Sequence, residues 1–176
     1  VLTSNVGKVA GFDPISGQNI DLAPHLMLVV AQRYLEQENP TKAREFFEKY
    51  KGSGKNYPEI YRSILNATEQ GMENIVDGYL NLLSGKFDTA YEKIKKGVDG
   101  YLRMSAGIKS EHLIFATRPM HIFLENEEYE YAYKLARPLI TAYKRNFNHR
   151  LNKGVKISDK EKQAIKNILS DFIFAA

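Results

Sequence analysis

The stretch LLSGKFDTAYEKIKKG, Leu82 to Gly97, contains an apolar stripe at helical spacing that enters a glycine bend and then continues. After the bend, Phe87, Ala90 and Ile94 recur at steps of three and four residues, the period of an amphipathic helix. Gly85 separates this stripe from the one before it, and glycine is a strong breaker of regular structure. The stretch therefore predicts two antiparallel helices joined by a short turn.

The same pattern occurs three times along the chain. Segments that begin at Ala31, Gly78 and Met120 can be aligned without a gap. Small residues coincide at Ala43, Ala90 and Ala132, leucines at Leu35, Leu82 and Leu124, and a ring or proline at Pro40, Phe87 and Tyr129. An alanine lets the second helix approach the first closely, while the leucine and the ring fill the groove beside the bend. The bend is therefore predicted to be one of three.

The first hairpin is predicted on either side of Asn39. From Pro24 onward, an apolar face at helical spacing is formed by Leu26, Val29, Val30, Tyr34 and Leu35. Asn39 is a suitable N-cap for the second helix, with Pro40 at the first helical position, where its missing N–H costs nothing. The residues expected to face the first helix are Ala43, Phe46, Phe47 and Tyr50.

Later helices are delimited by glycine, proline and capping residues. Pro58 opens a helix that Gly71 ends or bends, and Ser110 caps another in which Pro119 predicts a kink or a junction near Thr117. Ser158 and Glu161 form a capping-box pattern before a last helix. The apolar face of this last helix is expected to contain Ile165, Ile168, Leu169 and Phe172. The sequence predicts an all-α fold of about seven or eight helices and no strand.

The chain is predicted to form one helical domain over residues 23–176, preceded by an extended, turn-rich arm over residues 1–22. Hydrophobic residues make up 43% of the 176 residues and charged residues 26%, which is the composition of a soluble globular protein. No apolar run reaches the roughly 20 residues that a membrane span needs. The arm lacks the pattern of a signal peptide, which slightly favours a cytoplasmic location, and a start at Val1 indicates that upstream residues were removed or omitted.

The middle hairpin resembles the tetratricopeptide repeat (TPR) family of helical-hairpin repeats. Gly78, Leu82, Gly85, Phe87, Ala90, Ile94 and Gly97 match its preference for small, large, small, aromatic, alanine, large and small residues. The structural repeat positions are accordingly Ala43, Gly78, Gly85, Phe87, Ala90, Tyr129 and Ala132. The resemblance implies a right-handed array of antiparallel hairpins that binds a peptide or protein, and an irregular helical bundle stays open as the alternative.

Charge is polarised along the chain, whose formal net charge is +4. Between Lys134 and Lys166 there are ten Lys or Arg residues but only two acids, Asp159 and Glu161. Four glutamates lie just before this region, at Glu125, Glu127, Glu128 and Glu130. The basic region favours contact with nucleic acid phosphates or with an acidic protein.

No residue pattern indicates catalysis, a metal site or a cofactor. The chain has no cysteine, which excludes disulfides and thiolate chemistry. Its four histidines lack metal-ligand spacing, and neither a phosphate-binding glycine loop nor a nucleophile elbow occurs. The expectation is a non-enzymatic protein that binds a partner in a groove between hairpins.

Tyrosine and basic side chains are the candidates for partner contact, because tyrosine offers a large contact area at low entropic cost. The candidates are Tyr34, Tyr79, Asn81, Tyr101, Lys144, Arg145 and Arg150. Two alternatives stay open: association with nucleic acid through the basic C-terminal third, and a small helical inhibitor or immunity-type protein. The oligomeric state is not predicted.

Overall fold

The computed structural model describes residues 10–12, 19–21, 23–53, 59–103, 110–152, 154, 156–159, 162–163, 165–167 and 169–170; at 10–12, 19–21, 59–68, 101–103, 110–114, 142, 146, 149 and 151 only the backbone is described. Its elements are β1 (Ala10–Phe12), β2 (Asn19–Asp21), α1 (Ala23–Glu36), α2 (Pro40–Gly52), α3 (Glu59–Leu82), α4 (Phe87–Arg103), α5 (Ser110–Glu125) and α6 (Tyr129–Asn152). Further helical residues lie between 159 and 170 and are called the C-terminal segment below.

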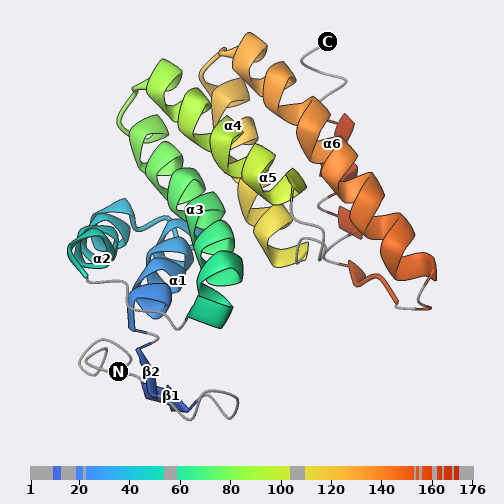
Figure 1. Cartoon of the computed structure of the whole chain (residues 1–176). Helices are drawn as coiled ribbons and strands as arrows, with labels where there is room; N and C mark the ends of the chain where they lie inside the picture. The colour runs from blue at the N-terminus through green and yellow to red at the C-terminus, as the bar shows by residue number, and fades with distance from the viewer. Residues whose placement is uncertain are drawn as a thin grey trace.

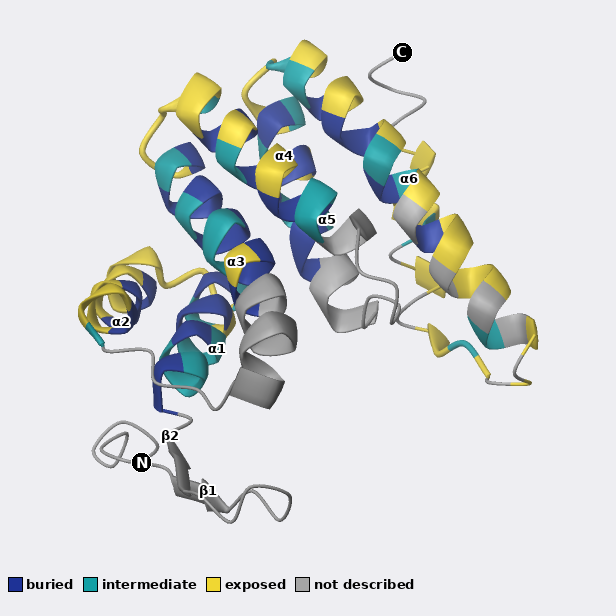
Figure 2. Cartoon of the chain, viewed as in Figure 1, coloured by how far each residue is buried: buried dark blue, intermediate teal, exposed yellow. Residues whose placement is uncertain are grey.

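The helices form three hairpins in chain order, α1 with α2, α3 with α4 and α5 with α6 (Figure 1). The first helices contact one another in series, α1 against α3 and α3 against α5, and α4 also contacts α6. The hydrophobic core runs between these helices, whereas the outer faces of α2 and α6 are exposed (Figure 2). The predicted all-α fold of antiparallel helical hairpins is confirmed.

The three predicted bends share one backbone geometry. Glu38, Gly85 and Glu127 have positive φ values of 59°, 71° and 62°. Each turn repeats two hydrogen bonds, from the following N–H to the carbonyl five residues earlier and from the positive-φ N–H to the carbonyl three residues earlier. This pattern is a Schellman motif, which satisfies carbonyls at a helix C-terminus. The motif recurs at the positions that the gapless alignment equates, so the prediction that the bend is one of three is confirmed.

Two of these turns place glutamate where glycine is the unstrained residue. A left-handed conformation costs an L-residue about 1–2 kcal/mol, and glycine avoids most of this strain. Glu127 is exposed, so its replacement should affect little besides the backbone. We expect Glu127→Gly to raise the free energy of unfolding by about 0.5–1 kcal/mol in chemical denaturation.

Gly85→Ala is the matched control for the Glu127 change. A Cβ at Gly85 would meet no atom within 4 Å, so any loss of stability would come from its positive φ alone. We expect a loss of about 1 kcal/mol. Equal effects of the same sign in the two variants would contradict the shared turn geometry.

Arginine side chains join different hairpins at two of these turns. Arg118 of α5 donates to the Glu36 carbonyl oxygen at 2.6 Å, at the end of α1. Arg44 of α2 donates to the Leu80 carbonyl oxygen at 3.5 Å, near the end of α3. Cationic groups at helix C-termini satisfy free carbonyls and complement the helix dipole. The turns are thus held by contacts between hairpins as well as within them.

Small residues allow α3 and α4 to pack closely. Ala90 of α4 is fully buried, and a Cβ at Gly78 of α3 would lie 2.9 Å from its carbonyl oxygen. A Cβ at Gly97 would lie 2.6 Å from the carbonyl oxygen of Gly71. Of the two alternatives predicted for Gly71, the helix end is wrong, because α3 continues from Glu59 to Leu82. The other alternative, a bend in the helix, stays a prediction. Gly71 lies where Gly97 and Gly100 of α4 approach the α3 backbone.

The capping and core predictions for the first hairpin are confirmed in α2 and partly in α1. Asn39 Oδ1 accepts a hydrogen bond from the Lys42 N–H at 3.1 Å, and Pro40 begins α2. The four predicted inward residues of α2 are buried. In α1 the most buried side chains are Leu28, Ala31 and Leu35, so the predicted face was shifted. Because α1 packs on both α2 and α3, its buried stripe lies between two half-buried flanks.

Three other expectations were wrong or lie outside the described residues. α5 continues through Pro119, so the alternative of a helix junction near Thr117 is wrong, because proline removes only one intrahelical hydrogen bond and Ala116 and Met120 are buried. The alternative of a kink stays a prediction. The N-terminal arm contains the antiparallel pair β1–β2, in which Ala10 opposes Asp21. Strands of three residues are too short to show an alternating pattern. Of the residues predicted for the apolar face of the last helix, those at 168 and 172 lie outside the described residues.

Candidate partner-binding groove

Helix α6 exposes a second apolar stripe beside the one that fills the core. The helix contains 24 residues and is about 36 Å long at 1.5 Å per residue. Leu135, Ala136 and Leu139 are buried in the core. Ile140, Tyr143 and Phe147 follow one another at steps of three and four residues and form a neighbouring stripe, in which Tyr143 is buried. This second stripe is covered only in part by the C-terminal segment.

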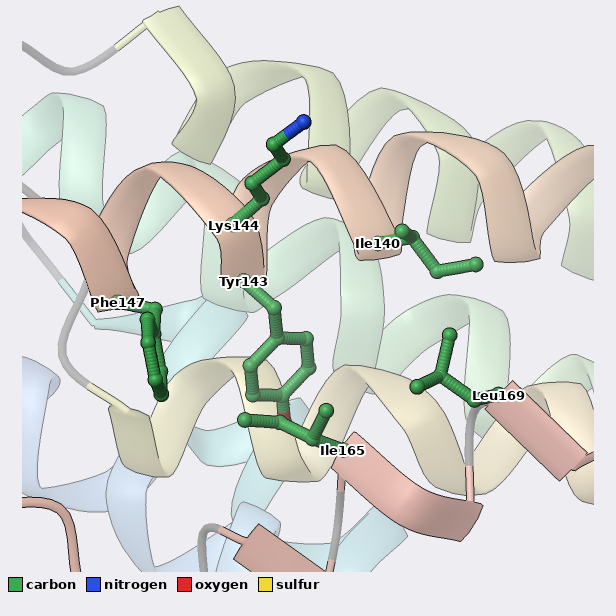
Figure 3. Close-up of a pocket in the computed structure, with 6 residues that line it drawn as sticks. All are labelled: Ile140, Tyr143, Lys144, Phe147, Ile165 and Leu169. Carbon is green, nitrogen blue, oxygen red and sulfur yellow. The ribbon is translucent and has the colours of Figure 1, made fainter.

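A pocket of about 260 Å³ lies between α6 and the C-terminal segment. Its lining residues are Ile140, Tyr143, Lys144, Phe147, Ile165 and Leu169 (Figure 3). Tyr143 and Phe147 point from α6 toward the segment, whereas Nζ of Lys144 points away from it. A lysine in this position contributes its methylene groups to the wall and keeps its ammonium in water. We call this pocket and its rim the α6 groove.

Two large apolar side chains are exposed at the α6 groove. Phe147 is 37% exposed and Leu169 is 45% exposed, whereas Tyr143 is only 6% exposed. The tyrosine therefore forms the floor, and Phe147 and Leu169 form an accessible edge. An apolar rim of this kind loses contact with water when a partner covers it, which favours binding.

The rim of the α6 groove is basic on the α6 side, where Lys144 lines the pocket. The sequence contains no Asp or Glu from residue 131 to residue 158. Lys144 and Arg145 are exposed on α6, and Lys166 is exposed on the C-terminal segment. Arg150 donates to the Lys156 carbonyl oxygen at 2.8 Å. This bond ties the end of α6 to the chain that leads into the C-terminal segment.

One acid on the C-terminal segment is already neutralised within the molecule. Lys162 Nζ lies 2.8 Å from Asp159 Oδ1. The hydrogen bond from Lys162 lowers the pKa of the Asp159 carboxyl, and the positive charge acts in the same direction. Asp159 consequently stays ionised at neutral pH, and its charge is matched by Lys162.

Two of the three predicted tyrosine contacts, Tyr34 and Tyr79, pack against aromatic rings within the fold. Tyr79 is 3% exposed and packs on Phe115, with ring centroids 5.8 Å apart, so proposing it as a partner contact was wrong. Burial raises the pKa of its hydroxyl. Tyr34 is half-buried and stacks on Phe46 at 5.6 Å. The Tyr101 side chain lies outside the described residues.

The other polar candidates divide between the two ends of the molecule. Asn81 is half-buried and its amide donates to the Asp77 carbonyl oxygen at 2.8 Å, within α3. Lys144 lies in the α6 groove, with Arg145 beside it in sequence and Arg150 farther along the same helix. The three basic candidates thus lie on one helix, and Tyr34, Tyr79 and Asn81 lie on other helices.

Sequence reasoning missed the apolar part of the groove. Ile140 and Phe147 were not predicted as partner contacts, and Ile165 and Leu169 were predicted only as an inward helical face. The steps of three and four residues from Ile140 to Phe147 were the available signal. That signal could not show that the C-terminal segment leaves part of the stripe open.

Two histidines form pairs with carboxylates. His25 Nδ1 lies 3.3 Å from Oε1 of Glu69, which is buried, and this pair joins α1 to α3. His121 Nε2 lies 3.5 Å from Glu125 Oε1 on the surface. Among the described residues, no group of three or more His, Asp or Glu side chains is arranged to hold a metal ion.

A second hollow lies along the exposed side of α4 and is lined by charges of both signs. Lys95 Nζ and Asp99 Oδ2 are 2.9 Å apart within it. Asp88 also lines this hollow and accepts a hydrogen bond from the Tyr131 hydroxyl, which raises the pKa of Tyr131 to about 12. These groups satisfy one another, so the hollow offers a partner less than the α6 groove does.

The comparisons with known proteins name no family for this chain. No protein-family model, curated protein or solved structure matches the chain. None of the helices in the described part of the chain combines the length and the apolar character needed to cross a membrane.

Proposed function

We propose that this chain is a non-enzymatic interaction module, built from TPR-like helical hairpins, that binds a protein or peptide partner. The observation that carries the proposal is the α6 groove, where Phe147 and Leu169 form an exposed apolar edge over a buried floor. This function needs no catalytic residue, metal or cofactor. It places the contact at the last hairpin, between α6 and the C-terminal segment.

The size of the groove supports a side chain as its occupant. Small-molecule sites have volumes of about 300–1,000 Å³ and enclose most of their ligand. A pocket of about 260 Å³ with an open edge suits one or two large apolar side chains of a partner. Such side chains act as anchors that contribute most of the binding energy of an interface.

Affinity capture with groove variants tests this function. We expect the wild-type protein to retain a protein partner at about 0.5 M salt, because apolar contacts are not screened. A variant with Phe147→Ser and Leu169→Ser should lose that partner. Leu83→Ser is the matched control, since Leu83 is also 45% exposed but lies at the turn between α3 and α4. Equal retention by the groove variant and the control would contradict the proposal.

A second candidate function is association with nucleic acid. It is favoured by the exposed Lys144 and Arg145 in a stretch without acids. In the same capture, nucleic acid that is retained at low salt and released at about 0.5 M would support it. Changing Lys144, Arg145 and Arg150 to alanine should then abolish its retention.

A further inference from the structure

We infer that the partner segment is an acidic amphipathic helix that lays its apolar side along α6 and its carboxylates against the basic rim. This inference rests on the proposed function and adds the chemistry of the partner. Four observations carry it: the spacing of the apolar wall, the open edge, the sign of the rim charge and the burial of Tyr143.

The apolar wall matches the repeat of a helix. Ile140 and Phe147 are seven residues apart, which corresponds to about 10.5 Å along α6. A partner helix presents apolar side chains at positions i, i+3 or i+4 and i+7 over the same length. Two consecutive anchors can therefore enter between α6 and the C-terminal segment.

The rim charge selects the polar side of the partner. Lys134 and Lys162 already pair with Glu130 and Asp159. Within the described part of the chain, no carboxylate pairs with Lys144, which is exposed. Complementary charges across an interface accelerate association and exclude partners of the same sign. Glutamate or aspartate on the flank of the partner helix that lies over α6 would meet the Lys144 ammonium, which points away from the C-terminal segment.

The burial of Tyr143 favours a peptide over nucleic acid. Bases bind to single-strand sites by stacking on exposed aromatic rings. Tyr143 is 6% exposed and closes the floor of the groove, so Phe147 is the one exposed aromatic side chain that lines it. Phosphates could contact the lysines but would leave the apolar edge uncovered.

Designed peptides test the inference with the whole chain. The probe is a fluorescent peptide of about 14 residues, four helical turns, with leucine at positions i, i+3, i+7 and i+10 and glutamate at most other positions. One control peptide has lysine in place of glutamate, and another has serine in place of leucine. We expect the acidic peptide to bind at least about tenfold more tightly than either control, by fluorescence anisotropy at about 0.1 M salt.

Variants of the protein test whether the peptide contacts the α6 groove. Changing Lys144→Glu should weaken binding of the acidic peptide by about tenfold and should improve binding of the lysine peptide. Lys96→Glu is the matched control, because Lys96 is exposed on α4 and outside the groove. It should change the affinity less than about twofold.

The outcomes separate the inference from the proposed function. If the lysine peptide binds as tightly as the acidic one but still needs Phe147 and Leu169, the acidic partner is overturned and the proposed function stands. If no peptide binds while the captured protein still depends on those two residues, the acidic helix is overturned alone. If nucleic acid or a second copy of the chain occupies the groove, the inference also fails. If the Phe147→Ser and Leu169→Ser variant loses neither peptide nor partner, both proposals fail.

Discussion

Gly97→Ala is expected to lower the free energy of unfolding by about 2 kcal/mol. A Cβ at this position would lie 2.6 Å from the Gly71 carbonyl oxygen and 2.6 Å from Cγ1 of Ile75. The isoleucine can change its rotamer, but the carbonyl belongs to the backbone of α3, so the two helices must separate. Overpacking of this kind costs about 1–3 kcal/mol, and a backbone clash lies at the upper end of that range. Alanine has a higher helix propensity than glycine, and this difference offsets about 1 kcal/mol of the cost.

Gly100→Ala on the same helix provides the control with the opposite sign. Its Cβ would lie 3.8 Å from the Gly71 Cα atom, an ordinary van der Waals distance. We expect it to stabilise the protein by about 0.5–1 kcal/mol through lower entropy of the unfolded chain. Urea denaturation of both variants measures the difference. If Gly97→Ala were as stable as Gly100→Ala, α3 and α4 would not pack at the distance described.

Phe123→Ala is expected to destabilise the protein by about 3–5 kcal/mol, the largest effect that we predict. Phe123 has no exposed surface, and its ring centroid lies 6.3 Å from that of Phe87 and 5.4 Å from that of Tyr131. The alanine would lose the transfer free energy of the ring and leave a cavity between the second and third hairpins. Because such a loss is a large fraction of the stability of a small domain, partial unfolding at 25 °C is expected.

Phe147→Ala makes the same chemical change outside the core. Its ring is 37% exposed at the edge of the α6 groove, so we expect a loss below about 1 kcal/mol. Thermal unfolding followed by circular dichroism compares the two variants. A small effect at Phe123, or a large one at Phe147, would be inconsistent with the packing of the hairpins. The comparison also establishes whether groove variants are folded enough for binding experiments.

Local sequence patterns predicted the helices best where the pattern and the packing agree. Asn39 and Pro40 mark the start of α2 because capping depends on the backbone within one turn. The three Schellman turns were found from aligned alanines and leucines, although only Gly85 among the three positive-φ residues is a glycine. The glutamates at the other two turns show that packing on both sides of a bend can impose a conformation that the residue itself disfavours.

The candidate site was predicted less well than the fold. The basic character of Lys144 and Arg145 was evident from the sequence, but the predicted tyrosine contact Tyr79 is a core residue. Exposure of a tyrosine depends on which neighbouring helix covers it, and α5 supplies Phe115 from 36 residues farther along the chain. Contacts at this separation leave no local pattern.

The sequence by itself determined the all-α class, the three helical hairpins, the register of their turns and the basic C-terminal third, because each depends on the order of residues over one or two helical turns. Only the tertiary structure decided that α3 continues through Gly71 and that α6 and the C-terminal segment leave an apolar groove open. Gly71 is a helix breaker in isolation and a point of close approach once α4 packs on it. Burial, unlike helical period, is a property of the neighbours that the folded chain brings together.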